Sequence, residues 1–238
     1  MATSSSPAVA ICAEGVHVAA SSRKTRVLVA DDHSIIRHGL CELLSASPQC
    51  QVVAMAATGR EAISKAAEAQ PDVAVLDINM PLLNGIEATR EIRRILPDTE
   101  VLILTAYESE HLADAILCAG ARGYLLKSDT ARDLVSAVES LGRGRPFFST
   151  SLAQTILDSY VHRRQDDEGA DFIPGLTSSE RQIIQLLAEG YCNKEIADKQ
   201  GITVKTAETH RANIMRKLKL RSISDVVRFA VRNQIIQA

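Results

Sequence analysis

The stretch Val73-Ala74-Val75-Leu76-Asp77-Ile78-Asn79-Met80-Pro81 decides the fold of this 238-residue chain. Its four consecutive apolar residues predict a strand that is buried on both faces, as in a parallel sheet covered by helices. Asp77 stands where this strand emerges from the sheet. Because ligands bind outside the carboxyl ends of the strands in open α/β sheets, Asp77 is a candidate for chemistry rather than packing.

Four more strand–helix units surround this strand. Apolar runs predict strands at 26–30, 51–55, 101–104 and 123–126. Helical spacing of apolar residues predicts helices at 34–45, 59–69, 84–96, 109–119 and 130–141. Because the connections are short and crossovers are right-handed, we expect a doubly wound α/β domain with a five-stranded parallel sheet.

Polar residues stand at the ends of four predicted strands. They are Asp31 and Asp32, Asp77, Thr105, and Lys127. Since parallel strands end at one edge of a sheet, three carboxylates, a hydroxyl and an ammonium should share one crevice. Three carboxylates repel one another, and a hard cation such as Mg²⁺, which also recruits phosphate oxygens, is the usual remedy. A carboxylate nucleophile beside a metal is one way in which aspartyl phosphates form.

Two other interpretations of this crevice are less favoured. His33 could ligate a metal, but Mg²⁺ prefers oxygen, so we interpret His33 as the start of the first helix.

A phosphatase with an Asp nucleophile would need a second acid two residues later. Asn79 occupies that position and cannot act as a general acid. We therefore do not predict an enzyme that turns over an external substrate.

The segment from about Arg26 to Leu141 resembles the receiver domain of two-component response regulators, which has a flavodoxin-like fold. The matching pieces are Val29-Ala30-Asp31-Asp32-His33, Leu76-Asp77-Ile78-Asn79-Met80-Pro81 with Asn84-Gly85, Leu104-Thr105-Ala106, and Gly123-Tyr124-Leu125-Leu126-Lys127. The resemblance implies that Asp77 accepts a phosphoryl group from a sensor histidine kinase. It also implies that Asp32 and Asp77 ligate Mg²⁺ directly, Asn79 through its backbone carbonyl, and Asp31 mainly through water.

The same resemblance implies a conformational switch. Thr105 would turn towards the phosphate, Tyr124 would follow it inward, and Lys127 would pair with the phosphate. Tyr107 is a second aromatic candidate for this role. Ser128 stands after Lys127 where many receivers carry proline, which concerns the geometry of the loop and not the role of the lysine.

The C-terminal part of the chain differs in charge and pattern. From Leu176 onward there are 11 Lys and Arg against 6 Asp and Glu, a net charge of +5, which leaves −7 for the rest. Such asymmetry suggests an anionic partner. A capping box of Thr177 and Glu180 opens one predicted helix, and others follow at 194–200, at 204–218 and after Ser222. The middle pair, joined by a turn of about three residues, predicts a helix-turn-helix.

The helix predicted at 204–218 has an apolar and a polar face. Although any surface helix has a polar face, small and hydrogen-bonding residues flanked by cations are what reading of the major groove needs. Arg211 points nearer the core, and we expect it to pair with Glu180 or Glu195. The predicted DNA contacts are Lys194, Thr203, Lys205, Glu208, Thr209, Ala212 and Arg216.

Three stretches of this part resemble the LuxR-type DNA-binding domain. They are Leu176-Thr177-x-x-Glu180, the run 188–197 and the run 204–214, with Ala207 where that family usually has valine. Together with the receiver, the chain resembles the NarL/FixJ subfamily. The resemblance implies binding to double-stranded DNA as a homodimer, with the fourth helix around Val226 and Val227 as the dimer contact.

We therefore predict a disordered extension at 1–24, a receiver at 25–144, a linker with a helix at 145–174 and a helix-turn-helix domain at 175–238. The predicted function is a DNA-binding transcriptional regulator activated by phosphorylation. The alternative is an orphan regulator of the same architecture that binds DNA independently of phosphorylation. We further hypothesise that the unphosphorylated receiver hides the third helix of the DNA-binding domain or its dimer helix near Val226.

The cysteine content and the length of the apolar runs indicate the cellular compartment of the protein. The five cysteines are odd in number and scattered, which indicates reduced thiols in a cytoplasmic protein and argues against both a disulfide framework and a zinc site. No apolar run approaches the roughly 20 residues that span a bilayer, so we predict no membrane segment.

Overall fold

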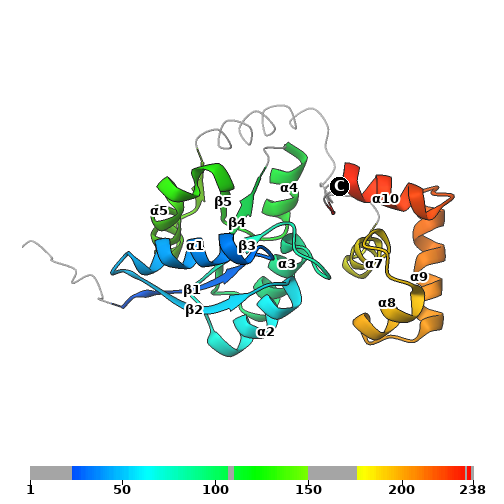
Figure 1. The fold of residues 1–238 in the computed structure, drawn as a ribbon, viewed down its shortest axis with the longest axis horizontal. Coiled ribbons are helices and arrows are strands. Elements are labelled where there is room, and N and C mark those ends of the chain that lie inside the picture. The colour runs from blue at the N-terminus through cyan, green and yellow to red at the C-terminus, as the bar shows by residue number, and fades with distance from the viewer. Residues whose placement is uncertain (1–22, 107–109, 150–175, 234, 237–238) are drawn as a thin grey trace, which may run out of the picture.

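The computed structural model describes residues 23–106, 110–149, 176–233 and 235–236. The predicted extension, except for its last two residues, the predicted linker helix and Tyr107 lie outside these residues. Two domains are described, an α/β domain before residue 150 and a helical domain after residue 175 (Figure 1). None of the helices in the described ranges combines the length and apolar character that crossing a bilayer needs.

The α/β domain is built on a parallel sheet with the strand order β2-β1-β3-β4-β5-β6. The strands are β1 (Thr25–Ala30), β2 (Cys50–Ala56), β3 (Val73–Asp77), β4 (Glu100–Thr105), β5 (Gly123–Leu126) and β6 (Phe147–Phe148). The helices are α1 (Ser34–Ser45), α2 (Gly59–Ala69), α3 (Gly85–Ile95), α4 (Glu110–Cys118) and α5 (Thr130–Gly142), the last preceded by a 3₁₀ turn, η1 (Lys127–Asp129).

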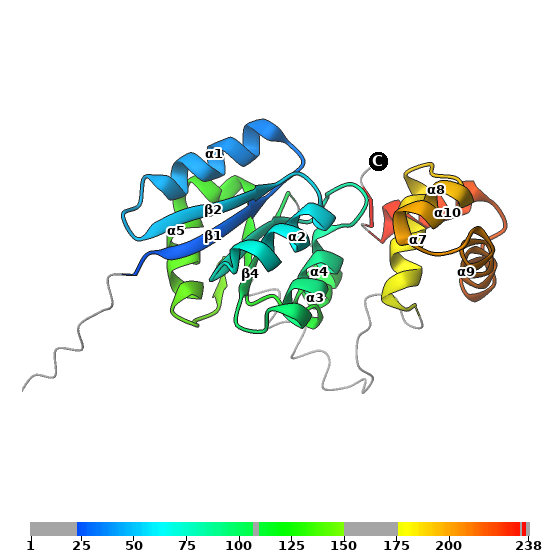
Figure 2. The same cartoon turned by 90° about the horizontal axis from the view of Figure 1, so that it is seen from below.

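Helices cover both faces of the sheet, as the unbroken apolar strands predict (Figure 2). Since successive strand residues point to opposite faces, Val27 and Val29 pack with α1 and α5, while Leu28 and Ala30 pack with α2, α3 and α4. All five residues of β3 are buried. The central strand β3 therefore has no face open to solvent. Its last residue, Asp77, is a buried carboxylate at the carboxyl end of the sheet.

Most element bounds agree with the predictions. The helices at 34–45 and 59–69 and the strand at 123–126 have the predicted bounds, and the other predicted elements of this domain differ by one residue at one or both ends. Local caps explain this agreement, because side chains that accept from the first-turn N–H groups mark where a helix begins. Thr58 accepts from the N–H of Glu61, and Asn84 accepts from the N–H of Glu87.

The sheet contains one strand more than predicted. Phe147 and Phe148 pair in parallel with Gly123 and Tyr124 of β5. The N–H of Ser149 then donates to the carbonyl of Tyr124 at 3.3 Å. The five-stranded prediction is therefore wrong by one edge strand, which lies in the stretch predicted as linker. Two residues are too few to show the periodicity by which strands are found in a sequence.

The helical domain contains α7 (Ser178–Ala188), α8 (Asn193–Gln200), α9 (Val204–Lys217) and α10 (Ile223–Arg232). Capping boxes open α7 at Thr177 and α10 at Ser222, and Thr203 caps α9. Gly201, with φ of +64°, makes the tight turn between α8 and α9, a conformation that costs glycine little. Helix α8 begins at Asn193, one residue before the predicted start at residue 194, and its N-cap is Cys192.

One core assignment in the helical domain corrects a prediction. Val226 is fully buried in the domain's own core, together with Ile184 of α7 and Ile214 of α9. It cannot also be a surface for dimer contact. On α10, Ile223 is the large apolar side chain that is exposed, and Val227 is half-buried.

Candidate functional site

Three polar side chains at strand ends meet at one edge of the sheet. Lys127 follows β5, and its Nζ lies 2.8 Å from Asp31 Oδ2 and 3.0 Å from Asp77 Oδ1. Asp31 and Asp77 are almost fully buried, with exposed fractions of 0% and 1%. The strand-end rule therefore brings together residues that are 96 positions apart in the chain (Asp31 and Lys127).

The donor atoms at this edge fit a hard cation. The ligand atoms of Asp31, Asp32, His33 and Asp77 all lie within 4.8 Å of one another. Asp77 Oδ1 is buried and, within the described part of the chain, accepts no hydrogen bond of good geometry, although Lys127 Nζ is at ion-pair distance. Several carboxylate oxygens within reach of one another form the environment in which Mg²⁺ binds.

His33 starts the first helix, as predicted. It is the N-cap residue of α1, although its side chain makes no cap hydrogen bond. Its backbone N–H donates to Asp31 Oδ1 at 2.8 Å, and its ring Nδ1 lies 2.7 Å from Asp32 Oδ1. The ring thus fixes the exposed carboxylate of Asp32 and lies close enough to count as a fourth possible ligand.

Burial and charge oppose each other in the pKa values of this cluster. Burial raises the pKa of the Asp77 carboxyl, with smaller increases from Asp31 and Asp32, and the Lys127 ammonium only partly offsets them. For Lys127, burial lowers the pKa, but the hydrogen bonds and charges of Asp31 and Asp77 outweigh this and leave the pKa raised. The ammonium is therefore charged and the cluster has more acids than cations.

The two predicted switch residues are both in the interior. Thr105 ends β4 with 2% of its surface exposed, and Tyr124 in β5 is 1% exposed. The side chain of Tyr124 is therefore already buried in this conformation, and its inward movement on phosphorylation stays a prediction. Asn79, in the loop after β3, is half-buried and lines the same cleft as Asp32.

Close packing fixes the helix that follows the site. A Cβ placed on Gly85, the first residue of α3, would lie 2.1 Å from the carbonyl oxygen of Asp77. Only glycine allows this approach of the helix to the end of β3. The loop between β3 and α3, residues 78–84, is thereby held against the candidate site.

A second polar cluster, which the sequence did not reveal, joins the two domains. Glu87 of α3 is 2% exposed and accepts a hydrogen bond from Arg181 Nε of α7 at 2.7 Å. Arg90 and the hydroxyl of Ser178 also donate to the Glu87 carboxylate. Arg181 is itself buried and donates to the carbonyl of Leu176 at 2.6 Å. The sequence shows these residues only as polar positions on two helices, which is what a solvated face also shows.

The polar face of α9 is open to solvent. All seven predicted DNA contacts are exposed, namely Lys194, Thr203, Lys205, Glu208, Thr209, Ala212 and Arg216. The hydroxyl of Thr203 is engaged as the cap of α9, and that of Thr209 donates back to the carbonyl of Lys205 at 2.9 Å. The hypothesis that the receiver hides this helix does not fit the structure, because α7 lies on the receiver side of the helical domain and α9 lies on the far side (Figures 1 and 2). Arg181 and Gln185 of α7 make hydrogen bonds with the receiver.

The expected partner of Arg211 was wrong. Its guanidinium donates to the side chain of Asn193 at 3.3 Å. Glu180 instead pairs with Lys217, whose Nζ lies 2.8 Å from Glu180 Oε1. Asn193 belongs to α8 and Glu180 to α7, and both helices pack against α9. A helical wheel of α9 alone could therefore not show which of the two acceptors pairs with Arg211 and which with Lys217.

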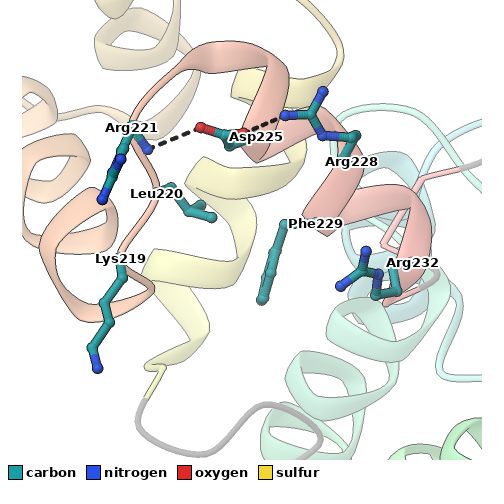
Figure 3. A pocket seen from close by; sticks show the side chains of 7 residues that line it. All are labelled: Lys219, Leu220, Arg221, Asp225, Arg228, Phe229 and Arg232. Carbon is teal, nitrogen blue, oxygen red and sulfur yellow. Dashed lines mark hydrogen bonds and ion pairs between the residues drawn. The ribbon is translucent and has the colours of Figure 1, made fainter.

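The junction of α9 and α10 carries a cationic pocket of about 310 Å³ that sequence reasoning missed (Figure 3). Asp225 is its one acid; it pairs with Arg228 and accepts from the backbone N–H of Arg221 at 3.0 Å. The pocket therefore has an excess of positive charge at the turn between α9 and α10 and along α10. Its lining residues are Lys219, Leu220, Arg221, Asp225, Arg228, Phe229 and Arg232.

Comparison with protein families gives two matches along the chain. Residues 27–139 match the response regulator receiver domain, and residues 174–230 match the bacterial regulatory proteins of the luxR family. The oxygen regulatory protein NreC of Staphylococcus epidermidis (strain RP62A) is 36% identical over 216 residues, covering 89% of this chain and 99% of the relative. The NreC protein of Staphylococcus haemolyticus is 35% identical over 214 residues, with the same coverage.

Solved structures agree with both domains. A two-component response regulator of the LuxR family from Aurantimonas sp. SI85-9A1 matches 58% of this chain and 99% of its own, with 38% identity and a TM-score of 0.56. The RcsB response regulator of Salmonella typhimurium matches 87% of this chain and 98% of its own, with 23% identity and a TM-score of 0.54. The second likeness is one of fold alone.

Proposed function

Because the chain belongs to the response regulators that join a receiver domain to a LuxR-type DNA-binding domain, we propose that phosphorylation of Asp77 controls its binding to double-stranded DNA. The observation that carries the proposal is the strand-end cluster, in which the Lys127 ammonium contacts the buried carboxylates of both Asp31 and Asp77. An acceptor for a phosphoryl group needs a carboxylate as nucleophile and a cation to hold the product.

The phosphoryl transfer would follow from this geometry. An Asp77 oxygen attacks the phosphorus of a phosphohistidine on a sensor kinase, the P–N bond breaks, and the imidazole leaves with the electron pair. Mg²⁺, held by Asp32, Asp77 and the Asn79 carbonyl, with Asp31 acting mainly through water, would neutralise charge on the transferring group. Lys127 then pairs with a phosphate oxygen, and the Thr105 hydroxyl donates to another.

On the DNA side, we assign two kinds of contact to the exposed residues of α8 and α9. Lys194, Lys205 and Arg216 would contact phosphates, which positions the domain without reading sequence. Glu208, Thr209 and Ala212 would read base edges in the major groove. Thr203 would add a contact at the start of α9. A homodimer would read two half-sites about one helical turn apart.

We also propose a cytoplasmic location, because free cysteines persist in a reducing compartment. The described cysteines, Cys41, Cys50, Cys118 and Cys192, are free thiols. A cytoplasmic regulator would meet both its DNA and the phosphohistidine of a sensor kinase in the same compartment.

The test is phosphorylation-dependent DNA binding. Genomic fragments are selected with the purified protein in the presence of Mg²⁺, with and without acetyl phosphate, and affinities for a selected fragment are then measured by fluorescence anisotropy. We expect the phosphodonor to tighten binding by the wild type and to leave Asp77→Asn unchanged. If Asp77→Asn binds as tightly as the phosphorylated wild type, the orphan regulator is the better description.

A further inference from the structure

One stripe of α7 faces the receiver instead of solvent. Ser178, Arg181, Gln185 and Glu189 are spaced three or four residues apart, so they lie in a row along the helix. Each of the four makes a hydrogen bond or ion pair with the receiver. Gln185 is only 1% exposed, which is unusual for an amide side chain on the surface helix of a domain.

Gln185 and Glu189 hold the backbone of the loop that follows Asp77. The Gln185 side chain accepts from the N–H of Asn84 at 2.9 Å and donates to the carbonyl of Met80 at 3.0 Å. Both carboxylate oxygens of Glu189 lie 3.3 Å from the N–H of Leu82. These contacts bind the DNA-binding domain to the same loop that carries Asn79, a candidate metal ligand.

Leu82 completes this contact. Its φ is +70°, a left-handed conformation that a branched side chain adopts at a cost. Its side chain packs against the apolar core of the helical domain. The loop is thus shaped by the partner domain at Met80, Leu82 and Asn84, and a receiver without its partner would lose these constraints.

The docked helix forms one wall of the entrance to the candidate phosphorylation site. A cleft of about 310 Å³ lies at this boundary. Its receiver side is formed by Asp32, His33, Asn79, Met80 and Pro81. Its other side is formed by Gln185, Ala188, Glu189, Ile235 and Ile236 of the helical domain.

The size of this cleft separates two classes of phosphodonor. A helix with its side chains is about 10–12 Å across, so a histidine carried by a folded protein cannot enter with its surroundings. A small donor such as acetyl phosphate or phosphoramidate is a few atoms long and fits the volume. Docked α7 would therefore exclude a protein phosphohistidine and admit a small phosphodonor.

We propose that docking of α7 selects the phosphodonor of this protein. The docked chain accepts a phosphoryl group from small donors, and a protein phosphohistidine reaches Asp77 only when α7 has left the loop. The inference rests on the proposed function of Asp77. In either reaction an Asp77 oxygen attacks phosphorus, and the P–O bond to acetate or the P–N bond to the donor nitrogen breaks. The leaving acetate, ammonia or imidazole takes the electron pair.

The experiment separates donor size from donor chemistry. Phosphoramidate and a phosphorylated histidine-phosphotransfer protein both break a P–N bond. They differ in size and in the leaving group, ammonia or imidazole, so each donor is compared between variants and not with the other donor. Rates of phosphoryl incorporation into the full-length chain are measured with each donor. Glu87→Arg would place three cations together with Arg90 and Arg181 and push α7 away from the receiver. Arg181→Glu would do so by opposing two carboxylates.

Glu91→Arg is the matched control. It makes the same charge change on α3, but Glu91 pairs with Arg94 of its own helix. The double variant Glu87→Arg with Arg181→Glu restores an opposite-charge pair and should restore docking. Small-angle scattering of each full-length variant reports whether the domains have separated, because separation raises the radius of gyration.

We expect Glu87→Arg and Arg181→Glu to raise the rate from the protein donor by roughly tenfold, the ratio for a chain that is docked about nine-tenths of the time. The rate from phosphoramidate should change less than about twofold, since this donor does not wait for the undocked state. Glu91→Arg should match the wild type with both donors, and the double variant should return towards it.

Three results would overturn the inference. The protein-donor rate could stay at the wild-type value in a variant whose domains have separated. Both donors could instead gain equally. The radius of gyration could also stay unchanged in both single variants, which would contradict the docking itself. Asp77→Asn distinguishes the two proposals: if it is still labelled, the proposed function fails, and if it is unlabelled while the donor ratio is constant, only donor selection fails.

Discussion

Two buried ionic clusters in this molecule use the same chemistry in opposite proportions. At the strand ends, the carboxylates of Asp31 and Asp77 share the single ammonium of Lys127. At the domain boundary, the single carboxylate of Glu87 is shared by two guanidiniums, those of Arg181 and Arg90. The first cluster is short of cations and the second is short of acids.

The difference in charge tells what each cluster can do. Burial raises the pKa of Asp77, so the site gains by receiving a cation, as a divalent metal would supply. Burial lowers the pKa of Arg90, and the Arg181 charge adds to this effect while Glu87 opposes it. The boundary cluster holds its surplus charge only while both domains contribute to it. A cluster short of cations is suited to bind a metal, whereas a cluster with surplus cations drawn from two domains is suited to be opened.

The largest expected effect separates the two carboxylates by function. Asp77→Asn should abolish phosphoryl incorporation from acetyl phosphate, because the amide is not a nucleophile for phosphorus. Chelation of Mg²⁺ should have the same effect on the wild type. Intact-mass spectrometry measures the gain of one phosphoryl group. Glu87→Gln is the control with the same chemical change, and it should still be labelled. Loss of labelling in both variants would contradict the comparison.

The next effect concerns stability. Lys127→Met leaves two buried carboxylates without their cation and should lower the free energy of unfolding by about 3–5 kcal/mol. Arg181→Met should cost on the order of 1 kcal/mol, since Glu87 keeps Arg90 and regains water when the domains separate. Urea unfolding measures both. Saturating Mg²⁺ should restore part of the loss in Lys127→Met and none in Arg181→Met. Equal losses would mean that the two clusters do not differ in this way.

A smaller effect should appear as a pH dependence. The folded pKa of Asp77 is raised above 3.8, so the folded chain holds a proton that the unfolded chain has already lost. The stability from this proton is fully present below pH 3.8 and is lost as the pH rises through the folded pKa. Above that pKa, the charged carboxylate costs stability in the absence of metal.

Asp77→Asn should therefore have the higher Tm at neutral pH in the presence of a chelator. The gap should narrow as the pH falls through the folded pKa of Asp77, and differential scanning fluorimetry across pH measures it. A gap that widens with falling pH would mean that the pKa of Asp77 is shifted in the other direction. The wild type should gain more from added Mg²⁺ than the variant gains.

The smallest effect on stability is expected at the exposed charges of α9, which have no buried partner to lose. Lys205→Gln should change the free energy of unfolding by less than about 0.5 kcal/mol. The same change should lower the salt slope of DNA binding by about one unit, because one phosphate contact is lost. Anisotropy titrations at several salt concentrations measure the slope. Thr209→Ala should weaken only some DNA sequences, by roughly 1–3 kcal/mol.

The strand-end cluster could be predicted from the sequence, because residues that follow parallel strands lie at the same edge of the sheet. Each of Asp31, Asp77 and Lys127 ends an apolar run, and parallel strands end at the same edge. The helix caps Asn84, Thr177, Thr203 and Ser222 were equally accessible, since a cap depends only on neighbours within one turn. Local rules and the strand-end rule account for most of the fold.

The boundary cluster could not be predicted, because nothing local distinguishes a buried polar stripe from a solvated one. Gln185 and Arg181 have the spacing of any outer helix face, and their burial depends on a loop and a helix (α3) about 100 residues earlier in the chain. The same ambiguity hid the Glu180–Lys217 pair. Strand β6 was not predicted for a different reason, because two residues are too few to show the alternation of apolar and polar residues that indicates a strand.

Strand β6 has a consequence for building chimeric regulators. It covers the edge of β5, where an unpaired strand would invite pairing with another chain. A receiver cut after α5, where the last long helix suggests a boundary, would lose Phe147 and Phe148 and expose that edge. A graft of this receiver onto another output domain should therefore retain the chain through Ser149, which is itself bound to Tyr124. Comparing the solubility of receivers that end at residue 142 and at residue 149 would show how much residues 147–149 protect the edge of β5.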